Sequence, residues 1–136
     1  MSDWVHIAAV FRLDFTAEPT PMEAYDIGER LGYHHDTGCC DIGESGPGES
    51  YPQGSEYFAD WEILRPGWDE TKNHQVVVVY GDLSDVSTLN GIEDWFYASC
   101  KRFGGSLVQA CCDLWLNDTR HRTLSWMPAY NNKQEN

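Results

Sequence analysis

Basic residues are scarce in this chain of 136 residues. Nine Lys and Arg oppose 22 Asp and Glu, which gives a formal net charge of −13 at pH 7. Proteins that bind nucleic acid directly neutralise its phosphates with Lys and Arg. The composition therefore argues against direct binding of DNA or RNA.

Long apolar runs are also missing. None approaches the roughly 18 residues of a membrane-spanning helix, and the opening MSDWVHIAAVF lacks the basic region of a signal peptide. Five cysteines, an odd number with vicinal pairs at Cys39, Cys40 and at Cys111, Cys112, make a poor disulfide framework. These absences predict a soluble protein of the cytoplasm, a reducing compartment, without membrane contact.

The usual catalytic signatures are absent as well. The sequence contains no phosphate-binding loop of the G-x-x-x-x-G-K-[ST] type, no nucleophile elbow and no H-E-x-x-H. Carboxylates are plentiful, but in an acidic protein a pair without a supporting motif is usually a solvated surface. The sequence thus favours a protein without catalytic residues, cofactor or bound metal.

What the chain does have is acid concentrated in one half. Residues 14–70 carry fourteen Asp and Glu against Arg30 and Arg65, a net charge of −12, whereas residues 71–136 are close to neutral. A surface of one sign steers association with a partner of the opposite sign. Solubility alone is the alternative explanation.

The composition also predicts a folded globule. Hydrophobic residues make up 41% of the chain and aromatic residues 13%, which is more apolar surface than disordered chains contain. The length fits one domain. We assign residues 1–130 to that domain and residues 131–136 to a frayed tail.

Hydrophobic periodicity predicts four strands and two helices. Apolar residues alternate over 4–15, 55–65, 74–83 and 106–116, and they follow helical spacing over 20–31 and 90–103, each helix ending at glycine. In the last strand the alternation places Val108 and Cys112 on the core face and Cys111 on the other face. The order βαββαβ predicts an α+β fold of the ferredoxin-like kind, an antiparallel sheet with two helices on one face and a hairpin between the second and third strands.

A 22-residue segment, 33–54, has no sustained periodicity and contains five Gly. It begins with YHHDTGCCD, whose His34, His35, Cys39 and Cys40 are zinc-ligand types, with His121 as a distant candidate. Structural zinc sites usually separate paired cysteines by two to four residues, and adjacent side chains diverge. We therefore expect a metal-free acidic loop that contributes to a partner surface, with a structural zinc module as the alternative.

Two H-x-T motifs give an enzymatic alternative. His35-Asp36-Thr37 and His121-Arg122-Thr123 resemble the paired signature of the 2H phosphoesterases, in which two histidines act as general acid and base on a phosphodiester. In that family the motifs lie on strands. Here the first is expected in a Gly-rich loop and the second beyond the end of the last strand.

Aromatic residues outside the periodic core are numerous. Trp68, Trp126 and Tyr130 fall in turn or terminal segments, and Trp4, Tyr51 and Trp115 are expected to be partly open. Large rings beside acids suit a protein interface. Alternatively, the long loop and the carboxy-terminal segment cover the second face of the sheet.

Three stretches of the chain are WVHIAAVFRLDF, GSEY and VVVVYGDLSD. Together with the length and the acidity of the chain, they resemble small proteins of tailed phages and prophages. Small acidic phage proteins without a catalytic motif are similar to inhibitors of bacterial defence systems, anti-CRISPR proteins among them. The resemblance implies binding to a basic, nucleic-acid-handling effector in the host cytoplasm, in some cases in place of its nucleic acid.

The leading hypothesis is therefore a non-enzymatic inhibitor that docks its acidic half on such a partner. Guide-bound nucleases hold nucleic acid in positively charged channels, so an acidic surface can compete for them. The residues expected to contact the partner are Asp36, Asp41, Glu44, Glu49, Glu56, Asp60, Glu62, Trp68, Asp69 and Glu70.

Overall fold

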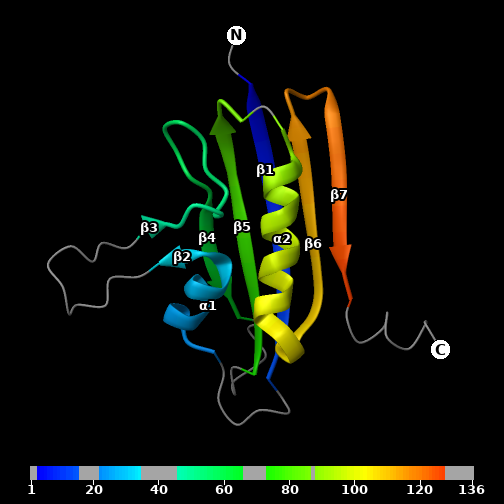
Figure 1. Cartoon of the computed structure of the whole chain (residues 1–136). Coiled ribbons are helices and arrows are strands. Elements are labelled where there is room, and N and C mark those ends of the chain that lie inside the picture. Colours follow the sequence, from blue (N-terminus) through cyan, green and yellow to red (C-terminus); the bar gives the residue numbers. More distant parts are fainter. Residues whose placement is uncertain (1–2, 16–21, 35–45, 66–72, 87, 128–136) are drawn as a thin grey trace, which may run out of the picture.

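The computed structural model describes residues 3–15, 22–34, 46–65, 73–86 and 88–127. Five strands form one antiparallel sheet in the order β4-β5-β1-β6-β7 (Figure 1). Their bounds are β1 Trp4–Asp14, β4 Asp60–Leu64, β5 His74–Ser84, β6 Leu107–Leu116 and β7 Arg120–Trp126. The helices are α1 Ala24–Leu31 and α2 Asn90–Phe103, and a 3-10 turn, Gly104–Ser106, follows α2. A small separate ladder pairs β2 Tyr33–His34 with β3 Gly46–Pro47.

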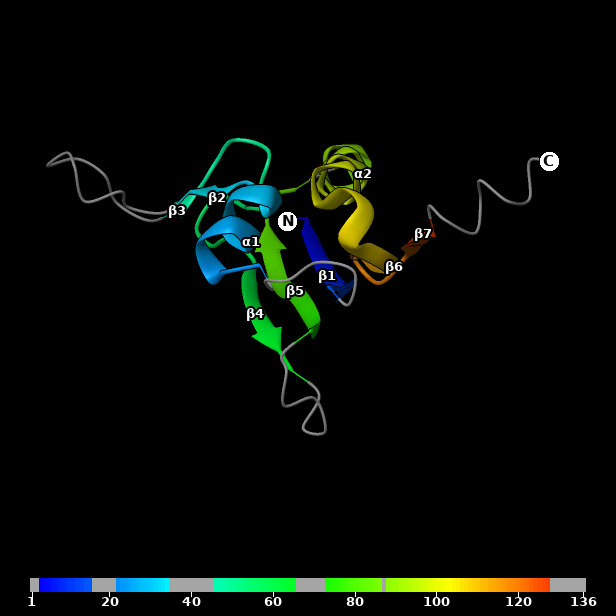
Figure 2. The same cartoon turned by 90° about the horizontal axis from the view of Figure 1, so that it is seen from below.

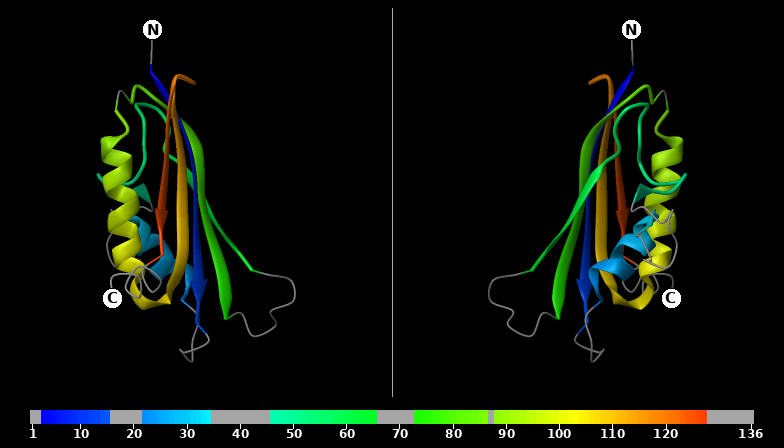
Figure 3. Two further views of the ribbon diagram at one scale, coloured as in Figure 1. Left: turned by 90° about the vertical axis from the view of Figure 1, so that its right-hand side faces the viewer. Right: turned by 90° about the vertical axis from the view of Figure 1, so that its left-hand side faces the viewer.

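The molecule has two layers. Both helices and the β2-β3 ladder lie on one face of the sheet (Figure 2). The opposite face carries neither helix, as the side views of Figure 3 show. The core lies between the layers, so the strands turn one face toward the helices and the other face outward.

The central strand β1 organises this core. It pairs with β5 over its whole length and with β6 on its other side. Its odd-numbered residues from Val5 to Leu13 are almost completely buried, as the alternation predicted. Trp95 of α2 packs edge-on against Phe11, and its indole N–H donates to the Leu31 carbonyl at 2.6 Å. Through these two contacts, Trp95 connects α2 both to α1 and to the central strand of the sheet.

The α+β class, the four predicted strands and both helices are confirmed, but the ferredoxin-like βαββαβ order is wrong. A fifth strand, β7, pairs with β6 through a three-residue turn that consists of Asn117, Asp118 and Thr119. Asn117 and Asp118 have positive φ, 55° and 59°, a left-handed conformation that Asn and Asp tolerate. The segment RHRTLSW is mostly polar, so its alternation is too weak to predict a strand.

Smaller differences also have physical causes. A bulge where β6 pairs with Arg12 and Leu13 shifts the alternation, so Leu107 and Ala110 point inward and Val108 is exposed. The prediction of Val108 on the core face is therefore wrong, whereas Cys112 inside and Cys111 outside are confirmed. The strand predicted at 55–65 begins only at Asp60, because the segment before it packs against the end of β5.

Candidate functional site

The outward side chains of the five strands form a surface that we call the open face. It carries both acidic and aromatic side chains. Trp115 and Trp4 remain 38% and 39% exposed on it. The residues of the open face include Trp4, His6, Ala8, Arg12, Asp60, Glu62, Tyr80, Asp82, Asp113, Trp115, His121 and Thr123.

Two of the carboxylates belong to the edge strand β4. Asp60 and Glu62 are exposed, while the intervening Trp61 packs toward the core. The Tyr80 hydroxyl of β5 donates a hydrogen bond to Glu62 Oε2 at 3.0 Å. This bond raises the pKa of Tyr80, so the phenol stays protonated and holds the carboxylate in place.

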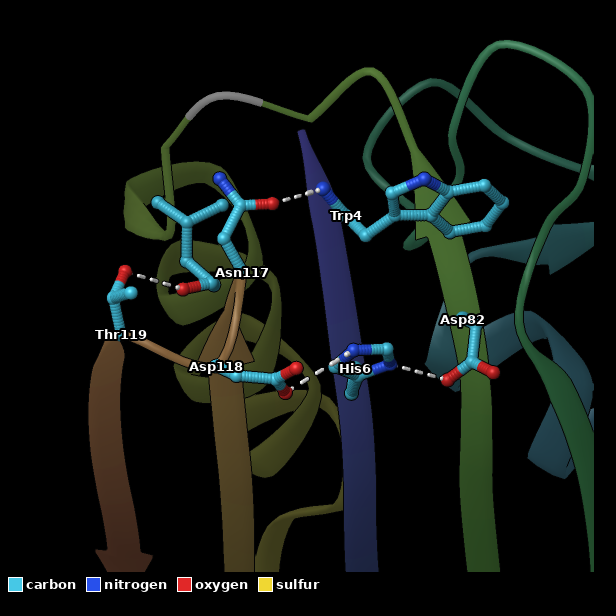
Figure 4. Close-up of polar contacts among 7 residues, drawn as sticks. Trp4, His6, Asp82, Asn117, Asp118 and Thr119 are labelled. Atoms are coloured by element: carbon cyan, nitrogen blue, oxygen red, sulfur yellow. Dashed lines mark hydrogen bonds and ion pairs between the residues drawn. The ribbon is translucent and has the colours of Figure 1, made fainter. Parts of the chain in front are cut away.

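His6 joins three elements at one end of the open face (Figure 4). Its Nδ1 is 2.6 Å from Asp82 Oδ1 of β5, and its Nε2 is 3.6 Å from Asp118 Oδ1 in the β6-β7 turn. An acid therefore stands at each ring nitrogen, and the imidazole has a defined orientation.

The turn that supplies Asp118 is itself anchored to the start of β1. The Trp4 backbone N–H donates to Asn117 Oδ1 at 2.8 Å, and the Asn117 N–H donates to the Trp4 carbonyl at 2.9 Å. Asn117 Nδ2 also donates to Asp3 Oδ1 at 2.8 Å. These bonds fix the position of the turn next to His6.

A second histidine occupies the other side of the open face. His121 Nε2 donates to Asp113 Oδ1, and the Thr123 hydroxyl donates to the same oxygen at 3.2 Å. The hydrogen bond from His121 is the main reason that the pKa of Asp113 is lowered. The imidazole is stacked on Trp115, with ring centroids 4.2 Å apart and planes 13° from parallel.

The strand register aligns these groups. Trp115 is the partner of His6 on one side and of His121 on the other, so imidazole, indole and imidazole form one row across three strands. In the adjacent row, exposed Ala8 lies between Tyr80 and Asp113. Flat rings beside carboxylates match the chemistry of a guanidinium or ammonium group.

The structure brings together only part of the predicted partner-binding set. Asp60 and Glu62 lie on the open face. Glu56 is exposed in the segment before β4, and Glu49 lies on the helix side, beside α2. The other predicted residues lie outside the described ranges: Asp36, Asp41, Glu44, Trp68, Asp69 and Glu70.

Sequence reasoning overlooked Asp82 and Asp113 as site residues, because both belong to the nearly neutral second half of the chain. Strand alternation was the available signal, since it assigns both to the outward face. The expectation for the aromatics was partly right. Trp4 and Trp115 are partly exposed, as expected. The prediction for Tyr51 is wrong, because this residue is 1% exposed and packs into the core.

The expected location of the second H-x-T motif is also wrong, because His121-Arg122-Thr123 lies on β7. Its histidine and threonine point to the same face, two residues apart along the strand. His35, Cys39 and Cys40 lie outside the described residues, as does the side chain of His34.

Within the described ranges, no group of three or more His, Cys, Asp or Glu side chains is arranged to hold a metal ion. None of the described helices has the length and apolar character needed to cross a membrane. No family model, no curated protein and no solved structure matches the chain.

Proposed function

We propose that this protein is a non-enzymatic inhibitor that docks its open face on a basic, nucleic-acid-handling protein, the kind of partner that the resemblance to phage anti-defence proteins implies. The observation that supports it best is that four carboxylates share the helix-free face with Tyr80 and Trp115. They are Asp60, Glu62, Asp82 and Asp113. Among the described residues of this face, histidines aside, Arg12 is the one basic residue. Its guanidinium donates a hydrogen bond to Gln109 Oε1 at 3.1 Å.

The arrangement suits a partner that normally holds phosphates. In the row of register partners Asp60, Tyr80, Ala8 and Asp113, the two carboxylates are three strand spacings apart, about 14 Å between backbones, and Asp60 and Glu62 are about 7 Å apart along β4. The four carboxylates therefore spread negative charge over β4, β5 and β6, which suits a positively charged channel. The exposed rings add apolar contact area, and aromatic residues often contribute most of the binding energy of an interface.

Neutralising Asp60 and Glu62 together, as Asp60→Asn and Glu62→Gln, is expected to weaken partner binding about tenfold at low salt, because two charge pairs at the interface are lost. The affinity should also become less dependent on salt concentration. The partner is captured from nuclease-treated host lysate and identified as a nucleic-acid-binding protein, and its Kd is then measured by calorimetry at several salt concentrations.

The matched control removes the same charge from the helix side, as Glu23→Gln with Asp26→Asn, two exposed positions at the start of α1. This control should keep close to wild-type affinity. Equal losses in both pairs would assign the effect to net charge and contradict docking through the open face. A partner that DNA or RNA oligonucleotides fail to displace would contradict competition for a nucleic-acid site.

A phosphodiesterase acting on a nucleotide or RNA end through His35 and His121 is the second candidate. It is favoured by the position of His121 and Thr123 on one face of β7. It is disfavoured by the hydrogen bond that His121 Nε2 already makes to Asp113. We expect no turnover of cyclic or linear nucleotides. Turnover that disappears in both His121→Ala and His35→Ala would instead establish the enzyme and overturn the inhibitor proposal.

A further inference from the structure

A groove of about 490 Å³ runs along α2 on the helix side, away from the open face. Its two walls are one face of α2 and the segment 49–53. The volume lies within the range of about 300–1,000 Å³ that is typical of ligand sites. The lining of the groove includes Glu49, Tyr51, Val86, Asp94, Trp95 and Ala98.

The floor of the groove is apolar. Tyr51 and Trp95 are both about 1% exposed and meet edge to face, with ring centroids 6.1 Å apart. Their polar atoms are already used, because the Tyr51 hydroxyl donates to the Ala59 carbonyl at 2.6 Å and the Trp95 indole donates to Leu31. The two rings therefore close the base of the groove, and the apolar surface open to a ligand belongs to the half-buried Val86 and Ala98.

The rim is acidic. Glu49 and Asp94 are exposed, and neither has a hydrogen bond or ion pair to another residue that the structure describes. Arg102 also borders the groove, but its guanidinium donates to the Arg30 carbonyl at 2.5 Å and to Ser99 Oγ at 3.2 Å. Both acceptors are neutral, so Arg102 keeps its positive charge, and the rim carries two carboxylates against one guanidinium.

The length of the groove limits what can fit. On α2 the lining runs from Gly91 to Arg102, which is about 16 Å at a rise of 1.5 Å per residue. An extended peptide of about five residues covers that distance. Gly91 and Ala98 keep the helical wall low, and a side chain added at Gly91 would meet nothing within 4 Å.

We infer that this groove binds a short basic segment of a partner protein. An apolar side chain of the segment packs against Val86 and Ala98, above the buried rings, and the flanking Lys or Arg side chains pair with Glu49 and Asp94. The site is separate from the open face, so it does not depend on the function proposed above.

The test uses the capped pentapeptide Lys-Leu-Phe-Leu-Lys and the ¹H–¹⁵N spectrum of the full chain. Titration should shift the Trp95 indole and Gly91 amide signals, and the charge-reversed peptide Glu-Leu-Phe-Leu-Glu should not bind. Neutralising the rim, as Glu49→Gln with Asp94→Asn, should weaken binding about tenfold because two exposed ion pairs are lost. Filling the groove with Ala98→Phe should abolish binding.

Two controls separate the groove from other surfaces. Glu56→Gln removes an exposed acid that does not line the groove and should leave the affinity unchanged. The open-face pair Asp60→Asn and Glu62→Gln should also leave it unchanged. Equal binding of both peptides would contradict recognition by the acidic rim. Signal shifts at Trp115 and His121, or no shift at millimolar peptide, would contradict the site.

Discussion

Above pH 9 the free energy of unfolding is expected to fall by roughly 2–3 kcal/mol for each pH unit, because two buried thiols must stay protonated in the folded chain. Burial raises the pKa of Cys100 and of Cys112 from 9.0 to about 12 each. In the unfolded chain both thiols ionise near pH 9. Since the folded pKa values are the higher ones, this stability is present in full below pH 9 and is lost as the pH rises toward 12. Tyr51, whose pKa burial also raises, adds to the loss above pH 10.

Urea unfolding at pH 8, 9.5 and 10.5, in the presence of a reductant, measures this slope. Cys100→Ala with Cys112→Ala should lower stability at pH 8 by leaving small cavities, but its stability should change much less between pH 8 and pH 10.5. Cys111→Ala is the control, because Cys111 is exposed on the open face. It should keep the wild-type slope. A double variant with the wild-type slope would show that other groups cause the alkaline loss.

The parts of the fold that the sequence predicts are those fixed by local apolar patterning. Alternation in β1 and β5 and helical spacing in α2 describe faces that the structure buries. Gly32 ends α1 in the left-handed region at φ 88°, as expected for a helix stop. In each of these cases the residue and its immediate neighbours determine the result.

What the sequence could not predict depends on contacts between distant segments. Strand β7 forms because β6 offers it an edge, and Leu124 is its one strongly buried residue. The bulge before Gln109 arises from pairing with β1 and has no local signature. The same limit applies to the site, because a charge count along the chain does not show that Asp82 and Asp113 lie on the same face as Asp60 and Glu62.

The segment before β4 also depends on such a contact, and it supplies the outer wall of the groove. Gly54 lies against the end of β5. Its N–H donates to the carbonyl of Tyr57, in the same segment, at 2.7 Å. The next residue, Ser55, donates its N–H to the Ser84 carbonyl at 3.0 Å, and the two hydroxyls are 3.1 Å apart. Ser84 cannot move easily, because it is the register partner of Trp4 in the sheet.

Gly54→Ala is therefore expected to destabilise the protein by about 3 kcal/mol, which corresponds to a decrease in Tm of about 10 °C. A Cβ at this position would lie 2.4 Å from the Ser84 carbonyl oxygen and 2.6 Å from its nitrogen, so the segment would have to move away from the sheet. The movement would displace the wall at 49–53, and binding of the basic pentapeptide should weaken as well. Gly91→Ala is the matched control, since the added methyl meets nothing within 4 Å and alanine favours the first turn of α2. Thermal unfolding followed by circular dichroism should show this control at or slightly above the wild-type Tm. Equal Tm values for the two variants would mean that segment 54–55 does not pack tightly on β5 in solution.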